Sequence, residues 1–324
     1  MKLATLRDGS RDGALLVVSR DLTQAVRAGD IAPNLQAALD SWSVAAPLLT
    51  ARAEALAAGK LPDAFALDLA TLAAPLPRCF GWIDSSVYLN HMELARSLRG
   101  ATVPDAYRRE PLMSIRMPSP FLAGHDDQPL PPGDVGLDIE GEVAILTGDI
   151  AAGTTAAQAG AGIHLLTLVS DTSLRTIFAR EVKEGKTSYH GKAPPAMAPV
   201  VATPDELGAA WDGGKPSLPL LCHINGQEIG HPNAGNDMSF DFRDIIAEAC
   251  LYRPLVAGTI IAAGTVSNRD RRVGSACIAE RRMIETLDHG APRTAYLAAG
   301  DTLRIEMLDA AGISIFGAIA QKIV

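Results

Sequence analysis

The sequence is poor in cysteine, and the few cysteines that it has are far apart. Only four occur among 324 residues, at Cys79, Cys222, Cys250 and Cys277, and no two of them form a Cys-x-x-Cys pair. This spacing excludes a zinc ribbon and a disulfide framework, because both need closely paired or numerous cysteines. We therefore expect reduced thiols and a cytoplasmic protein.

The chain also lacks an excess of basic residues. Its 29 Lys and Arg stand against 37 Asp and Glu, so the formal net charge is -8. Nucleic acids and anionic membranes bind basic surfaces, so we expect neither as a partner. The longest apolar runs, such as residues 255–264, are far shorter than a membrane span. Charged residues also come too early at the N-terminus for a secretory signal.

Several common catalytic motifs are missing as well. The chain has no His-Glu-x-x-His, Gly-x-Ser-x-Gly, P-loop or Gly-x-Gly-x-x-Gly motif in a supporting context. A bound metal is therefore expected to have oxygen ligands rather than zinc-type ligands. The composition, 48% hydrophobic and 20% charged, is ordinary for a soluble globular enzyme.

The most informative segment that is present spans residues 138–146, where polar and apolar residues alternate as in a strand. Residues two apart in a strand face the same side, so Glu140 and Glu142 are predicted to point together. Two such carboxylates repel each other unless a cation lies between them, and Mg²⁺ and Ca²⁺ prefer carboxylate oxygens. A Glu-x-Glu pair by itself is more often an exposed strand face, so other residues must decide.

The first 75 residues differ from the rest of the chain. Residues 3–6 and 14–18 read as short strands, and residues 34–58 have helical spacing with Pro47 as an interruption. Residues 74–78 contain two prolines and read as an extended linker, because residues before proline avoid the helical region. We predict a small N-terminal α+β domain over residues 1–75 and a second domain over residues 76–324.

The second domain is predicted to be rich in strands, with a few helices between them. Thr155 and Thr203 begin candidate capping boxes, Asn225-Gly226 predicts a hairpin turn, and residues 240–251 read as an amphipathic helix. Residues 259–264, 276–284, 302–308 and 313–318 read as strands. This order predicts an α+β fold with a large mixed sheet system rather than regular βαβ alternation.

Other polar residues with chemical potential surround the Glu pair in the sequence. Asp84 follows the apolar residues Trp82 and Ile83, and His91 comes seven residues later, at the start of a predicted helix. Asp171 ends an apolar strand, where it is either a metal ligand or, as the sequence favours, a helix N-cap. Arg175 would share a helix face with Asp171. Lys192 lies in a loop that contains two prolines.

Taken in order, these residues resemble the fumarylacetoacetate hydrolase family. The resemblance rests on an Asp and a His seven residues apart, a Glu-x-Glu strand, an Asp-x-x-x-Arg segment, a lysine about twenty residues later, a Gly-Thr-x-Ser segment and a Gly-x-x-Cys-x-x-Glu strand. The matching residues are Asp84, His91, Glu140, Glu142, Asp171, Arg175, Lys192, residues 264–267 and residues 274–280. The resemblance implies a mixed β-sandwich or roll of the fumarylacetoacetase C-terminal type.

The resemblance also implies a role for each of these residues. The implied metal ligands are Asp84, Glu140, Glu142 and Asp171, holding Mg²⁺, with Ca²⁺ or Mn²⁺ as alternatives. A dyad of His91 and Glu280 would activate water. The implied substrate contacts are Thr265, Arg175 and Lys192. Arg175 and Lys192 would also stabilise an oxyanion.

The implied reaction is hydrolytic cleavage of a carbon–carbon bond in a β-diketone, such as fumarylacetoacetate or an acylpyruvate-type diketo acid, in the breakdown of aromatic amino acids. The metal would favour the enolate, which is also the leaving group. The family further implies a homodimer. Two positions depart from the fumarylacetoacetase pattern, since Ser86 replaces a substrate-contacting Tyr and Phe178 replaces a Gln. The exact substrate therefore stays open.

Two other functions are compatible with the sequence. A tautomerase or decarboxylase of a small 2-oxo acid such as oxaloacetate belongs to the same family and needs the metal but no water-activating dyad. The presence of both His91 and Glu280 favours hydrolysis. A non-catalytic metal-binding module would leave Glu280, Thr265 and Lys192 without a role.

Overall fold

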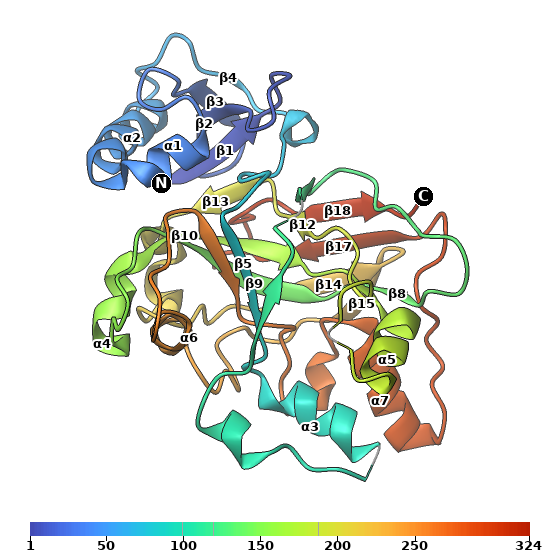
Figure 1. Cartoon of the computed structure of the whole chain (residues 1–324). Helices are drawn as coiled ribbons and strands as arrows, with labels where there is room; N and C mark the ends of the chain where they lie inside the picture. Colours follow the sequence, from blue (N-terminus) through green and yellow to red (C-terminus); the bar gives the residue numbers. More distant parts are fainter. Residues whose placement is uncertain (99, 119, 187) are drawn as a thin grey trace.

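The computed structural model describes residues 1–98, 100–118, 120–186 and 188–324 (Figure 1). The α-helices of these residues are α1 Leu35–Asp40, α2 Trp42–Ala57, α3 Leu89–Ser97, α4 Ala156–Ala159, α5 Arg175–Lys183, α6 Phe242–Ala249 and α7 Ile278–His289. Short 3₁₀ helices are η1 Leu69–Thr71, η2 Asp105–Arg108, η3 Gly160–Gly162, η4 Pro204–Ala210 and η5 Arg271–Val273. None of the described helices is long and apolar enough to cross a membrane.

The strands form one large mixed sheet and two smaller ones. The large sheet has the order β4-β3-β2-β1-β13-β10-β9-β16-β5-β6, with β12 and β7 attached beside β10. Its members are β1 Lys2–Leu6, β2 Ala14–Val18, β3 Gln24–Arg27, β4 Phe65–Ala66, β5 Gly81–Ser85, β6 Met113–Arg116, β7 Leu122–Ala123, β9 Gly141–Thr147, β10 Ile163–Ser170, β12 Ala196–Met197, β13 Val200–Ala202 and β16 Thr259–Ala262. The second sheet contains β15 Gln227–Gly230, β14 Leu221–Ile224, β17 Thr302–Glu306 and β18 Ile319–Lys322, and the third pairs β11 Ser173–Leu174 with β8 Leu137–Asp138.

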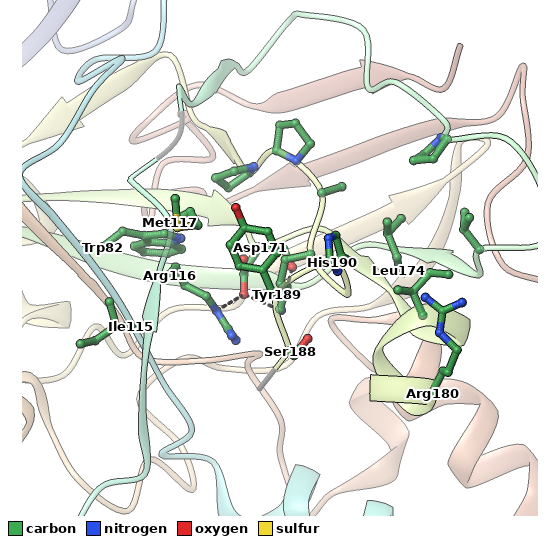
Figure 2. A pocket seen from close by; sticks show the side chains of 17 residues that line it. Trp82, Ile115, Arg116, Met117, Asp171, Leu174, Arg180, Ser188, Tyr189 and His190 are labelled. Atoms are coloured by element: carbon green, nitrogen blue, oxygen red, sulfur yellow. Dashed lines mark hydrogen bonds and ion pairs between the residues drawn. The ribbon is translucent and has the colours of Figure 1, made fainter. Parts of the chain in front are cut away.

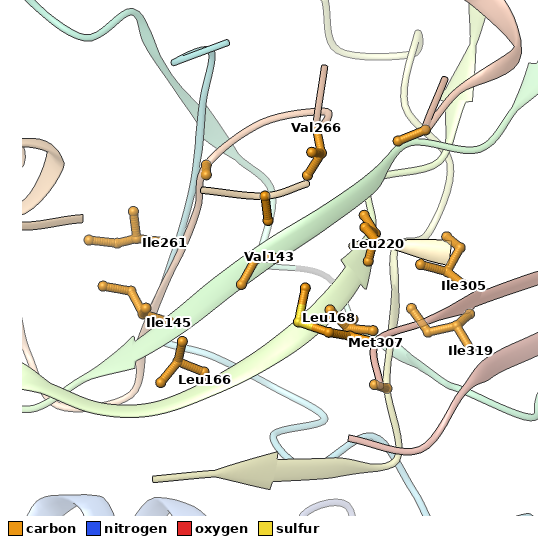
Figure 3. Packing of buried hydrophobic residues seen from close by; sticks show 14 of the residues in the cluster. Val143, Ile145, Leu166, Leu168, Leu220, Ile261, Val266, Ile305, Met307 and Ile319 are labelled. Carbon is orange, nitrogen blue, oxygen red and sulfur yellow. The ribbon is translucent and has the colours of Figure 1, made fainter. Parts of the chain in front are cut away.

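The middle of the large sheet is buried on both faces. Alternate residues of a strand point to opposite sides, so Val143 and Ile145 of β9 enter one core while Leu146 enters another. The first core lies between the large sheet and the second sheet, where Val143 and Leu168 pack with Ile305 and neighbouring residues (Figure 3). This packing of two sheets, together with the surrounding helices, confirms the α+β fold predicted from the sequence.

The second core lies under the N-terminal helices. Leu49 of α2 and Leu15 of β2 belong to the same buried cluster as Leu146 of β9 and Ile260 of β16. The N-terminal strands continue the large sheet, because β1 pairs with β13 (Figure 1). The domain boundary at residue 75 stays a prediction, since a shared core and sheet do not show whether the first 75 residues fold alone.

The helical region near residue 40 breaks at a different place from the one predicted. Pro47 lies inside α2, and the break falls at Ser41, between α1 and α2. Proline removes one backbone hydrogen bond from a helix. The carbonyl left without its partner belongs to Ser43, which is exposed, so water can satisfy it. The predicted interruption at Pro47 is therefore wrong.

Local signals elsewhere predicted some elements well and others badly. The hairpin of β14 and β15 forms, with Asn225 and Gly226 both at positive φ as its two-residue turn requires. The capping box at Thr155 is confirmed at α4, whereas the segment after Thr203 forms a 3₁₀ helix with a non-helical Gly208.

Two predicted strands are wrong. Residues 313–318 contain only an isolated bridge at Ser314, because the chain bends at positive φ at Gly312, just before the segment, and at Gly317 within it. Residues 276–284 begin the helix α7 rather than a strand. The helix starts there because its free N–H groups find acceptors, among them the Cys277 Sγ, which accepts from the Glu280 N–H at 3.3 Å.

Candidate metal and catalytic site

Three of the predicted metal ligands meet at one edge of the large sheet. Asp84 lies near the end of β5, Glu142 lies near the start of β9, and Asp171 directly follows β10. Because β9 runs antiparallel to β10 and β16, and β5 runs parallel to β16, these positions share an edge. The fold thus collects carboxylates from distant parts of the sequence.

The three carboxylates lie close enough to share one ion. One oxygen from each of Asp84, Glu142 and Asp171 lies within 4.8 Å of the other two, and all three residues are buried. Divalent cations such as Mg²⁺, Mn²⁺ and Ca²⁺ take carboxylate oxygens as ligands. We call these residues the acid triad; they could hold a divalent metal.

The electrostatics of the acid triad also fit a cation. Asp84 Oδ1 and Glu142 Oε2 are buried without a hydrogen-bond partner among the described residues. Burial, opposed by Arg116 and reinforced by Asp171, raises the pKa of Asp84 to about 7. Burial, followed by the charges of Asp84 and Asp171, raises the pKa of Glu142 well above its usual value. Carboxyl groups in this state bind either a proton or a cation.

Glu140, the fourth predicted ligand, faces cations of the protein itself. Its Oε1 accepts from Arg175 Nη2 at 2.5 Å, and its Oε2 accepts from Lys192 Nζ. Burial raises the pKa of Glu140, but Arg175 and Lys192 outweigh burial and hold that pKa below its usual value. Glu140 therefore borders the acid triad, and its role as a metal ligand stays a prediction.

The single strand predicted to carry Glu140 and Glu142 is interrupted before Glu142. Residues 138–146 do not form one strand, because β8 ends at Asp138 and β9 begins at Gly141, with Glu140 in an isolated bridge to Cys277. The two glutamates still lie near each other, since the Glu140 charge contributes to the raised pKa of Glu142.

Lys192 connects Glu140 to the acid triad. Its Nζ donates to Asp171 Oδ2 at 2.5 Å as well as to Glu140. Burial lowers the pKa of Lys192, yet Asp171 and Glu140 outweigh burial and raise it. Lys192 is therefore charged and placed to compete with a metal for the Asp171 oxygen.

Arg116 on β6 is a site residue that sequence analysis does not identify. Its Nη2 donates to Asp84 Oδ2, and its Nε lies 3.3 Å from Asp171 Oδ2. The pairing of β5 with β6, which sets Asp84 opposite Ser114, brings this arginine to the acid triad. The only sign in the sequence is a charge between the apolar residues Ile115 and Met117.

The acid triad and its charged neighbours form what we call the acid cluster. Its members are Asp84, Asp138, Glu140, Glu142, Asp171, Arg116, Arg175 and Lys192. Five carboxylates against three cations leave two negative charges without a partner. Burying unpaired charge is costly, and one divalent cation would balance both charges.

The environments of Asp171 and Arg175 differ from their sequence predictions. Asp171 is not a helix N-cap, because α5 begins at Arg175 after the short strand β11, and Leu174 is its cap residue. Arg175 does not pair with Asp171 along a helix face. It donates from Nε to Asp138 Oδ2 at 2.8 Å and from Nη2 to Glu140, so both of its contacts are with other carboxylates.

The predicted dyad is formed between two helices. His91 on α3 and Glu280 on α7 meet with Nδ1 and Oε2 2.7 Å apart. Glu280 is fully buried, whereas 21% of the His91 side chain is exposed. A buried carboxylate on one ring nitrogen orients the imidazole and leaves the other nitrogen free for a proton.

The segment that carries Thr265 lies between the acid triad and α3. Ala263 N donates to Val143 O, and Val266 N donates to Gly141 O, both at 3.1 Å, so the segment runs along the start of β9. Asn90 of α3 donates to Ser267 Oγ at 2.8 Å. Thr265 is buried in this segment, and its contact with a substrate stays a prediction.

A cavity of about 750 Å³ opens beside the acid cluster (Figure 2). Asp171, Lys192 and Arg116 line the part nearest the cluster, the exposed Tyr189 also lines the cavity, and Arg180 of α5 lies further away. Most of the remaining lining is apolar. Among the described residues the lining does not include His91, Glu280 or Arg175. The cavity thus offers a substrate cationic groups and apolar walls.

Two family models together cover almost the whole chain. The model described as fumarylacetoacetase N-terminal domain 2 matches residues 1–78, and the model described as fumarylacetoacetate (FAA) hydrolase C-terminal matches residues 84–324. The chain belongs to the fumarylacetoacetate hydrolase family. The resemblance inferred from the ordered motif is therefore confirmed. The similar proteins carry the names of a hydrolase, an isomerase and oxaloacetate tautomerases.

Curated relatives within the fumarylacetoacetate hydrolase family match only part of the chain. The human protein named oxaloacetate tautomerase FAHD2B, mitochondrial, is 26% identical over 160 residues, which are 48% of this chain and 48% of that protein. The Pongo abelii protein named fumarylacetoacetate hydrolase domain-containing protein 2 matches to the same extent. The matched region thus spans about half the length of these relatives.

Solved structures of other proteins share the fold over the whole chain. Maleylpyruvate hydrolase from Sphingobium sp. SYK-6 has a TM-score of 0.65 and 18% identity, and covers 100% of this chain and 99% of its own. It is also known in complex with manganese(II) and pyruvate. The 5-carboxymethyl-2-hydroxymuconate delta-isomerase from Mycobacterium smegmatis has a TM-score of 0.60 and 17% identity, covering 100% and 98%.

Proposed function

We propose that the protein is a metal-dependent hydrolase that cleaves a carbon–carbon bond in a β-diketo acid, such as fumarylacetoacetate or an acylpyruvate. The observation that carries the proposal is the 2.7 Å contact between His91 Nδ1 and Glu280 Oε2. Enolisation also needs a base for the carbon-bound proton, but hydrolysis needs a base positioned on a water molecule, and a histidine oriented by a buried carboxylate provides one. The dyad, together with the acid triad, supports hydrolysis.

The residues of the dyad would divide the work of activating water. Glu280 fixes the orientation of the imidazole through Nδ1. His91 then has Nε2 available to take a proton from water as the water attacks the carbonyl beside the bond to be broken. A divalent cation at the acid triad would polarise the carbonyl oxygens and stabilise the enolate that leaves.

The lining of the cavity supports a different set of cations as substrate contacts from the set that the family resemblance implies. Lys192 and Arg116 line the cavity, so they are the groups that a substrate carboxylate or a developing oxyanion would meet first. Arg175 is held by Asp138 and Glu140. We therefore propose Lys192, rather than Arg175, as the direct stabiliser of negative charge.

A substrate screen tests the proposed reaction. Acylpyruvates, fumarylacetoacetate and oxaloacetate would each be incubated with the protein in Mg²⁺, in Mn²⁺ and after chelation, with products followed by mass. A hydrolase releases two acids whose combined mass exceeds that of the substrate by one water, and only with metal. Turnover of oxaloacetate without release of two acids from any diketo acid would contradict the proposal.

The second candidate is a tautomerase of a small 2-oxo acid. The observation in its favour is that the curated relatives at 26% identity are named oxaloacetate tautomerases. That reaction would use the acid triad and Lys192 but would not need Glu280 beside His91. A non-catalytic metal-binding module ranks lower, because it gives no role to the dyad or to the cavity.

The ion and the assembly state are part of the same proposal. We propose Mg²⁺ as the working ion, with Mn²⁺ or Ca²⁺ able to replace it at an all-oxygen site. We also propose a homodimer. Strand β6 is the last strand of the large sheet and exposes Ile115, which makes this edge a candidate interface. Light scattering after size exclusion would report the mass, and a monomer at micromolar concentration would contradict the dimer.

A further inference from the structure

The first turn of α7 rests on a buried carboxylate from another part of the chain. Ile278 N donates to Asp138 Oδ1 at 2.7 Å, and Ala279 N donates to Asp138 Oδ2 at 2.9 Å. The first N–H groups of a helix have no partner within it, and the helix dipole favours a negative charge there. Asp138 is fully buried, so it can act as a fixed support for the start of this helix.

The same carboxylate also faces the acid cluster. Asp138 Oδ2 accepts from Arg175 Nε at 2.8 Å, and Arg175 Nη2 donates to Glu140 Oε1 at 2.5 Å. A backbone hydrogen bond also joins the start of β9 to the segment before α7, because Gly141 N donates to Ala276 O at 2.9 Å. Asp138 therefore touches α7 on one side and the guanidinium that holds Glu140 on the other.

Glu280 follows immediately after the two residues that Asp138 holds. It is the third residue of α7, and its N–H donates to Cys277 Sγ at 3.3 Å. A shift or rotation of this first turn would carry the Glu280 carboxylate away from His91, because side-chain direction in a helix follows the backbone of the turn. The contact of 2.7 Å in the dyad leaves little room for such a shift.

We propose that Asp138 is a positioning residue: it fixes the first turn of α7 so that Glu280 meets His91, and through Arg175 it places this dyad relative to Glu140. Its effect on turnover rests on the proposed hydrolase function. Its effect on the geometry of His91 does not, so the two can be tested separately.

The variant Asp138→Asn tests the proposal in the full-length protein. The amide keeps the size of the side chain but loses its charge. Because both oxygens of Asp138 accept hydrogen bonds, the new NH₂ group must face another donor, either an α7 N–H or the Arg175 guanidinium. Proton NMR of protein labelled with ¹⁵N-histidine would follow the signal of the His91 imidazole N–H that donates a hydrogen bond to Glu280. That signal is identified as the one lost in both His91→Ala and Glu280→Gln.

We expect Asp138→Asn to shift or abolish this signal and to lower kcat about 10- to 100-fold, the usual cost of losing a group that orients a catalytic residue. Binding of Mn²⁺, measured by calorimetry, should change far less than kcat, because Asp138 is not a member of the acid triad. KM should also stay near the wild-type value.

Asp241→Asn is a matched control. Asp241 caps α6 with the same contacts, accepting from Arg243 N at 2.7 Å, from Asp244 N at 3.2 Å and from the Arg243 side chain at 2.5 Å. It has no contact with the acid cluster among the described residues. This variant should lower the thermal stability but leave the His91 signal and kcat unchanged.

The proposal is overturned if Asp138→Asn behaves like the control, losing stability while the folded protein keeps the His91 signal and kcat. Should Asp138→Asn fail to fold, Asp138→Ser would be measured by the same signal, since a serine hydroxyl can still accept from one N–H of the first turn. If the wild type turns over no substrate, the hydrolase proposal fails, but the His91 signal still decides whether Asp138 positions the dyad.

Discussion

Glu140 and Glu142 differ sharply in their surroundings although they are two residues apart. Glu142 faces other carboxylates and has an oxygen without a partner among the described residues, whereas Glu140 is bonded to Arg175 and Lys192. The metal-free protein should therefore respond to their removal in opposite directions, even if both residues serve a bound ion.

Glu142→Gln should stabilise the metal-free protein by about 1–3 kcal/mol, because a buried carboxylate without a partner is removed. Glu140→Gln should destabilise it by about 1–3 kcal/mol, because Arg175 and Lys192 each lose one of their two carboxylate partners. Urea denaturation with EDTA would measure both values. Calorimetry should show weaker Mn²⁺ binding for Glu142→Gln; unchanged affinity in both variants would remove the Glu pair from the metal site.

Lys192→Met separates a role toward substrate from a role toward metal. Because Lys192 Nζ occupies an oxygen of Asp171, its loss should leave Mn²⁺ affinity equal to that of the wild type or higher. If the ammonium stabilises an oxyanion, kcat should fall about 10²- to 10³-fold. Steady-state kinetics and calorimetry would test this. If the variant had the same kinetics as the wild type, the lysine would only balance charge.

At the scale of elements, the segment after β16 packs closely against the strand that carries Asp84. Gly264 has φ +89, and a Cβ there would lie 2.1 Å from Ser85 O, one residue from Asp84. Gly226 in the β14–β15 turn has a similar φ of +74, but a Cβ would meet nothing within 4 Å. Substitution of both glycines by alanine would therefore distinguish the free-energy cost of a left-handed backbone, which both share, from the cost of close packing, which only Gly264 has.

Gly226→Ala should lower the free energy of unfolding by about 1–2 kcal/mol, the cost of a left-handed residue with a Cβ. Gly264→Ala should cost at least about 3 kcal/mol, since overpacking adds to that strain, and it should weaken Mn²⁺ binding by displacing Asp84. Denaturation curves and calorimetry on the two variants test this. Equal costs and equal Mn²⁺ affinities would mean that the segment can relax without moving the triad.

The sequence predicts features that depend on local order or on short-range turns. The ordered motif leads to the family and to the His91–Glu280 pair, and Asn225-Gly226 leads to the hairpin. It misassigns α7, because two N–H groups in the first turn of this helix are held by Asp138, which is distant in the sequence. Arg116 is missed for the same reason, since only the pairing of β5 with β6 brings it to Asp84.

For the whole molecule, pH should change metal affinity and metal-free stability in opposite directions. Burial raises the pKa of Asp84 from 3.8 to about 7, so the folded protein holds this proton more tightly than the unfolded chain does. The contribution of this protonated carboxyl group to the free energy of unfolding is complete below about pH 4 and is lost as the pH rises toward 7. Metal must displace the same proton, so affinity rises over that range.

We therefore expect Mn²⁺ affinity to increase about tenfold or more between pH 6 and pH 8, while the melting temperature in EDTA falls between pH 5 and pH 8. Asp84→Asn should flatten the stability change. Calorimetry and thermal unfolding at matched ionic strength would measure both trends. A melting temperature in EDTA that rises with pH would contradict the electrostatics of the acid triad.

We propose that His91 and Glu280 act as one unit in water-dependent cleavage. The most direct measurement compares cleavage with deuterium exchange at the carbon between the two carbonyls, in the wild type, His91→Ala, Glu280→Gln and the double variant. We predict that each single change lowers cleavage about 10²- to 10⁴-fold. The double variant should lose little more than the worse single variant, and exchange, which depends on the acid triad, should persist in all of them. Fully additive losses, or cleavage untouched in either single variant, would contradict the dyad and favour the tautomerase.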